Sequence, residues 1–190
     1  MKPMETRLAL LARKGDSRAF AELVHLYGDK LYQLAYRMTG NRQDAEDIVQ
    51  ETFLRVFRNL HRYDENLKFS TWIYRIASNL CIDRLRKRRI VYSLDAAGTE
   101  YEDLDGYSAL PADERTPEHE VMLTETQRAV RQAIETLPVK YRAIMMLRYV
   151  QDLSLQEIAE VLELPVTTVK TRVHRAREYM RRKVGHLFRP

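Results

Sequence analysis

Apolar side chains recur every three or four positions over most of this sequence, which is the spacing of one face of an α-helix. The first such stripe begins after Ser17 and ends at Gly40 and Asn41, two residues that stop helices. It consists of Phe20, Leu23, Val24, Tyr27, Leu31, Leu34, Ala35 and Met38. The pattern therefore predicts a long amphipathic helix in this part of the chain.

Two further helices are predicted before residue 90. The second spans about Gln43–Leu60, and its core stripe is formed by Ala45, Ile48, Val49, Phe53, Val56, Phe57 and Leu60. A polar and aromatic loop, 61–69, follows it. The third helix spans about Thr71–Arg89, with Ser70 as its N-cap, because a serine side chain accepts hydrogen bonds from the first turn.

The middle of the chain has a different character. Residues 91–116 contain two glycines, Pro111 and no sustained period, and they are rich in acidic side chains: Asp95, Glu100, Glu102, Asp103, Asp105, Asp113 and Glu114. This composition predicts a flexible linker. Helical patterning resumes at Thr116 and Pro117, an N-cap followed by proline at the first helical position.

Three more helices are predicted toward the C-terminus. One spans about Val139–Val150, after a proline breaks the preceding helix. Ser154 and Glu157 form a capping box for a short helix that ends near Leu162. Pro165 opens the last and most basic helix, and no strand pattern of useful length occurs in the sequence.

Charge divides into three blocks along the chain. Residues 1–90 carry a net +7, residues 91–126 a net −9 and residues 127–190 a net +7. Each basic block is a candidate for a polyanionic partner. We predict an all-α protein with two small helical domains, an N-terminal bundle over 1–90 and a C-terminal helix-turn-helix bundle over 117–190, joined by the flexible acidic linker 91–116.

The run 153–175 has the layout of a helix-turn-helix. A tight turn at 163–165 separates the short helix from the basic one, and Ala159 lets the two helices cross closely. Val169 and Val173 anchor the basic helix by its inner face, so its polar side chains point outward. The residues that we expect to contact duplex DNA are Lys170, Thr171, Arg172, His174, Arg175 and Arg177.

A basic amphipathic helix that is merely solvated on one side is the alternative interpretation of this run. The capped short helix, the turn length and the inward valines favour DNA binding over it. Glu163 departs from the common pattern, because glycine often occupies this turn position. A slightly different turn is therefore expected.

The second predicted helix has a polar face opposite its core stripe, formed by Asp44, Asp47, Gln50, Glu51, Leu54 and Arg58. A metal or acid–base site is one interpretation of its carboxylates, but no histidine or second carboxylate cluster converges on them. A solvated face with acids near a helix N-terminus is another. Protein docking is the favoured interpretation, since an exposed leucine among acids suits a basic partner.

Aromatic and basic side chains meet at the third predicted helix. The aromatic residues at or before its start are Tyr63, Phe69, Trp72 and Tyr74, and the residues that recur along its far side are Arg75, Asn79, Ile82, Arg86 and Arg89. Single-stranded DNA suits such a surface, because bases stack on rings while arginines hold phosphates. Aromatic residues at a loop–helix junction are equally often core residues, so both interpretations stay open.

Other chemistry is not expected. Cys81 is the single cysteine, which excludes an internal disulfide, and we expect it to be a small buried hydrophobe. The five histidines are scattered, so neither a metal site nor a cofactor is predicted. The apolar run 8–12 is too short for a signal segment and no stretch could span a bilayer, which predicts a soluble, cytoplasmic protein.

Three parts of the sequence resemble the extracytoplasmic-function (ECF) subgroup of bacterial sigma factors. They are 44–57 (DAEDIVQETFLRVF), 68–79 with 83–89 (KFSTWIYRIASN and DRLRKRR), and 154–177 preceded by Leu137–Pro138 and Tyr141–Arg142. The match covers both helical blocks in order. In detail the sequence is most similar to the sigma W branch of bacilli.

The resemblance implies a role for each predicted domain. The domain 1–90 would be region 2-like, with polymerase contacts from Asp44, Asp47, Gln50, Glu51 and Leu54. It would also melt and read the promoter −10 element as a single strand, through Arg62, Tyr63, Lys68, Phe69, Trp72, Arg75, Asn79 and Arg86. The domain 117–190 would be region 4-like and would bind the −35 element with the duplex-contacting residues named above.

The resemblance also implies partners. These are core RNA polymerase, through its β′ clamp and β flap, promoter DNA, and an anti-sigma factor, typically membrane-anchored. No small-molecule substrate is implied. The protein would work at the nucleoid, or be held at the membrane by the anti-sigma factor, and its acidic linker would enter the polymerase RNA channel.

We therefore hypothesise a sigma factor, not an enzyme, that directs promoter-specific transcription initiation by core RNA polymerase for a cell-envelope stress regulon. A stand-alone helix-turn-helix regulator is the alternative, but it would need a dimerisation or sensor segment, and neither is apparent. A small nuclease using Asp44, Asp47 and Glu51 is a further rival. These acids lie on one short helix face with no supporting base.

Overall fold

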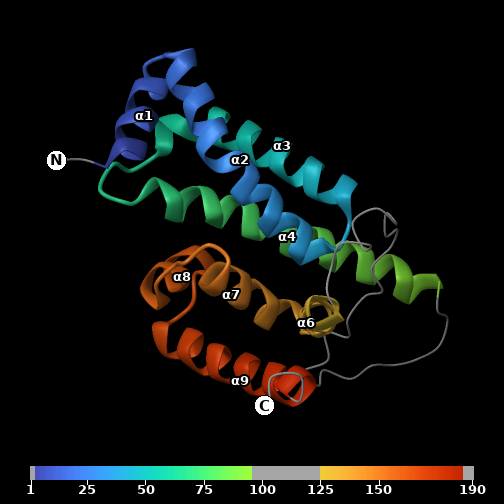
Figure 1. Cartoon of the computed structure of the whole chain (residues 1–190). Helices are drawn as coiled ribbons and strands as arrows, with labels where there is room; N and C mark the ends of the chain where they lie inside the picture. Colours follow the sequence, from blue (N-terminus) through green and yellow to red (C-terminus); the bar gives the residue numbers. More distant parts are fainter. Residues whose placement is uncertain (1–2, 96–124, 186–190) are drawn as a thin grey trace.

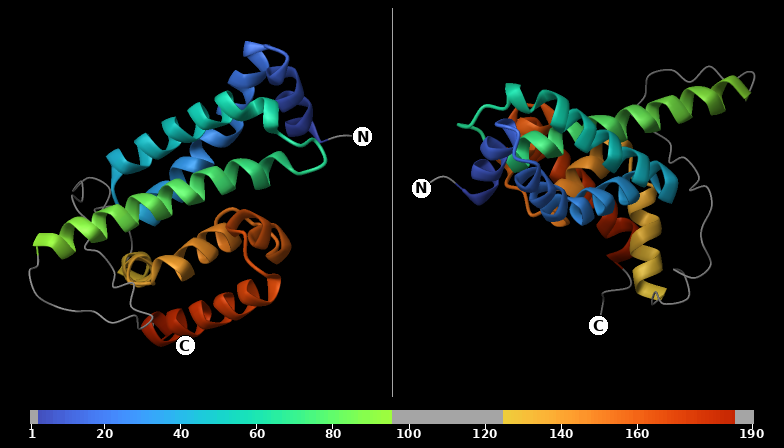
Figure 2. Two further views of the ribbon diagram at one scale, coloured as in Figure 1. Left: turned by 180° about the vertical axis from the view of Figure 1, so that it is seen from behind. Right: turned by 90° about the horizontal axis from the view of Figure 1, so that it is seen from above.

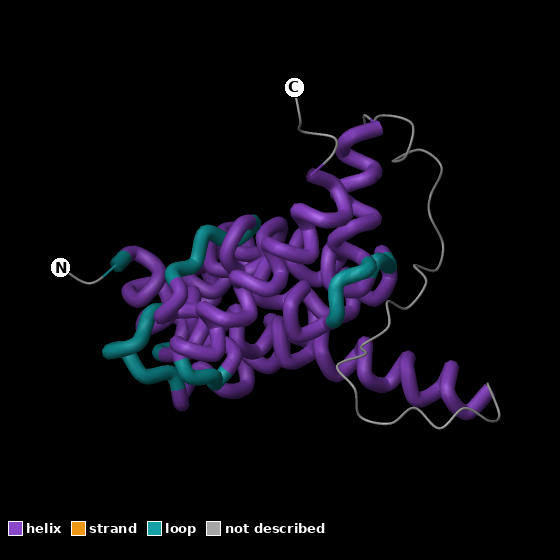
Figure 3. Tube along the Cα trace, turned by 90° about the horizontal axis from the view of Figure 1, so that it is seen from below, coloured by secondary structure: helices purple, strands orange, loops and turns teal. Residues whose placement is uncertain are grey.

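The structure is a computed structural model that describes residues 3–95 and 125–185. Every element within these ranges is a helix, as predicted (Figure 3). The N-terminal half comprises α1 (Met4–Arg13), α2 (Ser17–Thr39), α3 (Arg42–Asn59), the short 3-10 helix η1 (Leu60–Arg62) and α4 (Phe69–Asp95). The C-terminal half comprises α6 (Glu125–Glu135), α7 (Val139–Tyr149), α8 (Leu155–Leu162) and α9 (Val166–Val184).

Capping side chains set where α2 and α3 begin. The Asp16 carboxylate accepts two backbone hydrogen bonds from the first turn of α2, at 2.9 and 3.1 Å. Asn41 Oδ1 accepts one from the N–H of Asp44 at 2.8 Å. Between the helices, Gly40 has a φ of 69°, a left-handed conformation that glycine adopts without a steric penalty. The predicted helix end at Gly40 is confirmed.

α1 is not among the predicted helices, because its apolar run is short. It nevertheless packs on α2 and buries Thr6, Ala9 and Ala12. Small side chains at this spacing let two helices approach closely, but they give only a weak hydrophobic stripe. The sequence pattern therefore underestimates this helix.

The bounds predicted for the third helix are wrong at both ends. α4 begins at Phe69, so Ser70 lies inside the helix and is not its N-cap. The helix also continues to Asp95, because no glycine or proline interrupts 89–95. The predicted helix start at Thr116 lies outside the described residues.

α2, α3 and α4 pack around one core, whose largest fully buried side chains are Leu23, Leu31, Leu34, Met38, Val56, Phe69 and Ile73. Phe57 was expected in this core and is instead 63% exposed, with its ring against the edge of Phe20 (centroids 5.3 Å apart). Val56 takes the inward position, and the next residue is rotated by about 100° around the helix. Phe57 therefore lies at the outer margin of the stripe.

Aromatic rings close the end of the N-terminal half where the 61–69 loop enters α4. The rings are Tyr27, Tyr63, Phe69, Trp72 and Tyr74, and their contacting centroids are 5.3 to 6.0 Å apart. The Tyr63 hydroxyl donates to the carbonyl oxygen of Leu67 at 2.6 Å. This cluster fixes the loop against the helix bundle.

The C-terminal half contains the predicted helix-turn-helix. Both hydrogen bonds of the capping box are present, from the Glu157 N–H to Ser154 Oγ (3.2 Å) and from the Ser154 N–H to Glu157 Oε2 (2.8 Å). Glu163 ends α8 with a φ of 53°, which non-glycine residues adopt at some cost. Val169 and Val173 are buried, which confirms the predicted inner face of α9.

The two halves lie against one another, with α4 beside α8 and α2 beside α7 (Figures 1 and 2). α7 and α8 form the middle layer, and α9 forms the outer layer beyond them (Figure 1). Buried apolar residues from both halves belong to one continuous core cluster. No pattern in the sequence predicts this contact, since the amphipathic stripes do not reveal which helix faces which.

Candidate nucleic-acid interface

α9 presents the predicted duplex-reading face to solvent. Lys170, Thr171, His174, Arg175 and Arg177 are exposed, while Arg172 is half-buried. The buried valines on the opposite side fix the rotation of the helix, and the turn at Glu163 sets its direction. The exposed face combines cations, hydroxyls and an imidazole, which can contact both phosphates and base edges.

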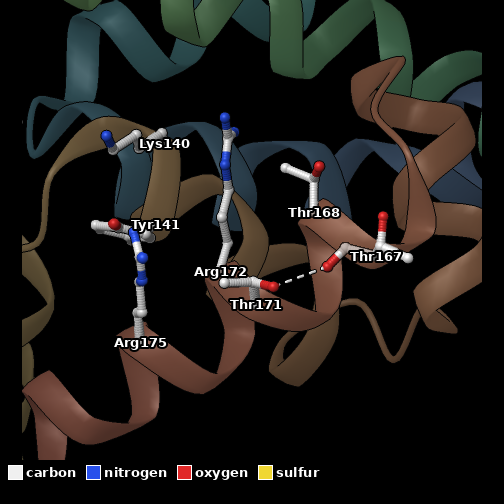
Figure 4. A pocket seen from close by; sticks show the side chains of 7 residues that line it. All are labelled: Lys140, Tyr141, Thr167, Thr168, Thr171, Arg172 and Arg175. Carbon is white, nitrogen blue, oxygen red and sulfur yellow. Dashed lines mark hydrogen bonds between the residues drawn. The ribbon is translucent and has the colours of Figure 1, made fainter.

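A basic pocket lies between the first turns of α9 and the start of α7 (Figure 4). It has a volume of about 320 Å³ and is lined by Lys140, Tyr141, Thr167, Thr168, Thr171, Arg172 and Arg175. The Thr171 hydroxyl donates to the Thr167 carbonyl at 3.0 Å (Figure 4), and Arg175 and Tyr141 both line the pocket. Convergent cations and hydroxyls of this kind suit a phosphate oxygen.

The duplex-contacting residues predicted from the sequence include only some of those that line this pocket. Lys140 and Tyr141 come from α7, and the ammonium of Lys140 lies 5.3 Å from the Tyr141 ring centroid. Their position beside α9 depends on how α7 packs on it, which is tertiary information. The only available signal was Tyr141 itself, which lies in one of the stretches that resemble sigma factors.

The residues predicted to hold single-stranded DNA do not share one environment. Arg62, Asn79 and Arg86 are exposed, and Trp72 is half-buried. Tyr63 is 3% exposed and Phe69 is fully buried, so their rings serve the core. Stacking of bases on these two rings is not supported by their placement, and the core interpretation describes them better.

Lys68 and Arg75 contact the C-terminal half instead of solvent alone. The Lys68 ammonium lies 2.7 Å from Glu157 Oε1. The Arg75 guanidinium donates to the Glu160 carbonyl at 2.8 Å and lies 3.5 Å from the Glu163 carboxylate. Two of the four cations of the predicted single-strand surface are therefore held by α8 and the turn that follows it.

The Glu157 carboxylate is strongly stabilised in its charged form. Burial by itself would raise its pKa, but hydrogen bonds from Lys68 and from Ser154 outweigh that effect and lower the pKa of Glu157 to about 2. Glu157 thus serves two structures at once. It caps α8, and it pairs with a cation of the other half.

The candidate docking face lies on α3. Asp47, Gln50 and Leu54 are exposed, and Leu54 retains 49% of its surface. The Asp44 carboxylate pairs with Arg84 at 3.2 Å and Arg88 at 3.4 Å and ties α3 to α4, and the more exposed Asp47 shares Arg84 at 3.2 Å. A structural role explains Asp44 without a partner.

The apolar part of this face is larger than the sequence pattern indicates. Phe57, one turn beyond Leu54, is exposed as well. Glu51 is half-buried and pairs with Arg55 at 2.7 Å. Leu54 and Phe57 together form an apolar strip with acids beside it, which suits a partner that is both apolar and basic.

Within residues 3–95 and 125–185, no group of three or more His, Cys, Asp or Glu side chains is placed to hold a metal ion. None of the described helices is long and apolar enough to cross a membrane. Cys81 is fully buried, as expected, and burial raises the pKa of its thiol to about 12.

Two family models match the chain: Sigma-70 region 2 over residues 23–104, and Sigma-70, region 4 over residues 127–180. The chain is also 50% identical over 175 residues to the ECF RNA polymerase sigma factor SigW of Bacillus subtilis (strain 168), covering 92% of this chain and 94% of that protein. This chain belongs to the ECF sigma factors. The resemblance stated from the sequence, including its likeness to sigma W, is confirmed, and the family is not a class of enzymes.

Solved structures share the fold of this ECF sigma factor. CnrH in complex with the cytosolic domain of CnrY has a TM-score of 0.69 at 26% identity, covering 94% of this chain and 95% of that chain. The sigma factor RpoE of Bartonella quintana, solved with the anti-sigma factor NepR, has a TM-score of 0.66 at 22% identity, covering 90% and 98% of the two chains. Both likenesses therefore extend over both helical halves.

Proposed function

We propose that this ECF sigma factor binds core RNA polymerase and directs it to a subset of promoters, where it helps to open the DNA. It makes and breaks no bonds itself, because the polymerase carries out the chemistry. The observation that carries the proposal is the presence, in one chain of this family, of two separate basic surfaces, one on α9 and one on α4. A promoter offers two matching targets, a duplex element and a melted one.

Each surface receives a role. α9 would bind the −35 duplex, with Lys170, Thr171, His174 and Arg175 toward the bases and Arg172 and Arg177 toward phosphates. The pocket between α9 and α7 would bind a phosphate of the DNA backbone beside the groove that α9 enters. α4 and the loop before it would hold the melted −10 strand through Arg62, Lys68, Trp72, Arg75, Asn79 and Arg86.

The polymerase would dock on α3. Leu54 and Phe57 supply apolar area, and Asp47, Gln50 and Glu51 surround it with polar and acidic groups that suit the β′ clamp. The C-terminal half would in addition reach the β flap. The domains proposed for these tasks are 1–90 and 117–190, with 91–116 between them.

Further partners follow from the family. An anti-sigma factor is proposed as the inhibitor, supported by the solved RpoE–NepR complex, whose sigma chain has the same fold. Membrane anchoring of that inhibitor, action at the nucleoid and a cell-envelope stress regulon are proposed from the resemblance to sigma W alone. No cofactor or small-molecule substrate is part of the proposal.

Transcription by purified components tests the proposal. The full chain is added to core polymerase on a promoter library, and the start sites of the transcripts are mapped. We expect specific transcripts that require both the chain and core polymerase. A stand-alone regulator would instead bind its duplex site equally tightly with and without polymerase, and that result would contradict the sigma-factor proposal.

A further inference from the structure

The C-terminal end of α1 carries two exposed cations that the proposed function does not use. They are Arg13, the last residue of the helix, and Lys14, its C-cap. The turn after them contains Gly15, whose φ of 97° favours glycine, and the Gly15 N–H donates to the Ala12 carbonyl at 3.0 Å. Arg13 and Lys14 together are called the α1 tip below.

The α1 tip lies beside the loop that is proposed to read the −10 element. α1 packs against η1 and α4, next to the loop 61–69 (Figures 1 and 2). The Arg13 guanidinium donates to the Tyr63 carbonyl at 3.4 Å, and the adjacent Arg62 is exposed. Nearer the start of α1, the hydroxyls of Thr6 and Tyr63 are 3.4 Å apart. These contacts place the α1 tip next to Arg62, which is proposed to hold the melted strand.

Three acidic residues of α1, the turn after it and the loop hold other groups. The Asp16 carboxylate caps α2, and the Glu5 carboxylate accepts from the Tyr27 hydroxyl at 2.7 Å. Asp64 accepts two hydrogen bonds from Asn66, both at 2.9 Å. None of the ion pairs within the described part of the chain includes the α1 tip. Its two charges are therefore available to a polyanion.

A structural role alone predicts a different behaviour. Cations at the C-terminal end of a helix interact favourably with the helix dipole, so the α1 tip also stabilises α1. That role acts on the stability of the N-terminal half and would affect every DNA ligand equally. A role in binding would affect only those DNA molecules that reach the α1 tip.

The position of the α1 tip relative to α4 gives its place along the promoter. The C-terminal half, which is proposed to bind the upstream −35 element, follows the C-terminal end of α4 in the chain. The α1 tip lies at the opposite end, beside the loop that enters α4 at Phe69. It is therefore expected on the downstream side of the proposed single-strand surface.

We infer that the α1 tip binds phosphates of the melted DNA strand just downstream of the −10 element and so continues the single-strand surface of α4 and its loop. The inference rests on the proposed function and extends it to a helix outside the match to Sigma-70 region 2, which begins at residue 23. Lysine and arginine contacts with phosphates carry no sequence information, so the α1 tip adds affinity but no base preference.

Binding of forked DNA by the complex of the full chain with core polymerase tests the inference. Two probes share the −35 duplex and the −10 element. In the short probe the single strand ends with the −10 element, and in the long probe it continues for about five nucleotides. Such an extension spans about 17 Å at 3.4 Å per nucleotide. This is more than the length of α1, which is about 15 Å for 10 residues.

The test variant is Arg13→Gln with Lys14→Gln, which removes both charges. The matched control is Arg13→Lys with Lys14→Arg, which keeps them. Removal of the charges should weaken binding of the long probe by about 25-fold at 0.1 M salt and lower the slope of log affinity against log salt by about 1.4. These are the values that counterion release gives for two phosphate contacts with a single strand. The short probe should bind as tightly as to the wild type.

The control should match the wild type on both probes, because charge is kept. Three results would overturn the inference: equal affinity of the wild type and the test variant for the long probe, an equal loss on both probes, or an equal loss in the control. An equal loss on both probes would identify a purely structural role, and thermal unfolding followed by circular dichroism would then show a less stable test variant.

Failure of the inference and failure of the proposed function are distinguishable. The proposed function is judged with the wild-type chain, which would give no specific transcripts with core polymerase if that function were wrong. The inference is judged by the difference between the long and the short probe in the variants. A wild-type chain that directs specific transcription, together with a test variant that binds both probes normally, would remove the inference alone.

Discussion

The basic faces of α9 and α4 have similar chemistry but differ in exposure: the first faces solvent, and the second contacts the C-terminal half. On α9, Lys170, His174 and Arg175 are exposed to solvent. On α4 and the loop before it, Arg75 and Lys68 are bound by carbonyl and carboxylate groups of α8 and of the turn that follows it. Composition alone would rank the two surfaces equally. The difference shows that availability depends on which neighbouring element supplies negative charge.

One short helix creates this difference. α8 buries Ile158, Ala159 and Val161 in the apolar core of the C-terminal half, and this core supports the inner face of α9. On its other side, the carboxylates of Glu157 and of Glu163, the residue that follows α8, lie beside Lys68 and Arg75. The same element therefore displays one reading surface and covers the other, and the predictions below separate these two effects.

The largest effect is expected on α9. Replacing Lys170 and Arg175 together with alanine should cost about 2 kcal/mol or more of duplex binding, or about 30-fold in affinity, because base and phosphate contacts are both lost. Fluorescence anisotropy with the duplex upstream of a mapped start site would measure it. Arg182→Ala, exposed at the far end of α9, is the control. An equal loss of single-strand binding would contradict the division of roles.

Arg75 should affect opening but not duplex capture. Arg75→Gln removes a proposed contact with the melted strand, so we expect about tenfold less open complex, as loss of about 1.4 kcal/mol implies. The fluorescence of 2-aminopurine placed in the −10 element reports strand separation. Arg18→Gln, at an exposed position on α2, should open promoters normally. Weakened duplex binding by Arg75→Gln would argue against the assignment.

The docking face on α3 is exposed, as the basic face of α9 is, but a substitution there should affect the binding of polymerase only. Leu54→Ala should weaken core polymerase binding by about fivefold to tenfold, the loss of about 1 kcal/mol or more that is typical of a buried interface anchor. Leu11→Ala, which truncates a similarly exposed leucine on α1, is the matched control. Surface plasmon resonance with immobilised core polymerase would compare them. A change in duplex affinity of Leu54→Ala would contradict a docking role.

Cys81 distinguishes opening of the halves from unfolding. Burial raises the pKa of its thiol to about 12, so at neutral pH the thiol is protonated as well as inaccessible. Alkylation by iodoacetamide should be slow in the native chain and fast in guanidinium. A double variant, Glu157→Gln with Gln151→Ala, removes bonds between the two halves. It should not accelerate alkylation, because Cys81 lies in the N-terminal core. Rapid labelling of the double variant would mean that these changes unfold the N-terminal half.

The smallest effect is expected from pH. The lowered pKa of Glu157 means that its charge contributes stability above the ordinary value of 4.5, and that the contribution is lost as pH falls from there toward 2. The pKa of Lys68 is raised by its hydrogen bond to Glu157, so its contribution is lost only above the ordinary value of 10.5. The distance between the halves should therefore be constant from about pH 5 to about pH 9. Opening near pH 6 would implicate another group.

Much of the fold follows from local patterns in the sequence. Gly40 ends α2, Ser154 and Glu157 cap α8, and the valines of α9 turn inward, all as the spacing predicts. Local patterns fail to predict where a helix ends when no glycine or proline marks the end, as at the C-terminal end of α4. They also fail for Phe57, which lies at the margin of a stripe, where a few tens of degrees decide burial.

The candidate surfaces show the same division between local and tertiary information. The α9 face was predictable, because a helix with one buried side must expose the other. The roles of Tyr63 and Phe69 were not, since rings at a loop–helix junction suit either a core or a ligand, and packing with Tyr27 decides. The hydrogen bonds from Lys68 and Arg75 to α8 join residues more than 80 positions apart in sequence, and no spacing rule reaches that far.

The contact between the two halves engages Lys68 and Arg75, so the proposed function requires the halves to separate on polymerase, and one distance measures this. Spin labels at His61→Cys and Arg177→Cys lie on exposed positions of the two halves, and the buried Cys81 should stay unlabelled. Double electron–electron resonance should give one narrow, short distance for the free chain. Adding core polymerase should replace it with a longer one. The same distribution with and without polymerase, or a broad one in the free chain, would contradict the account.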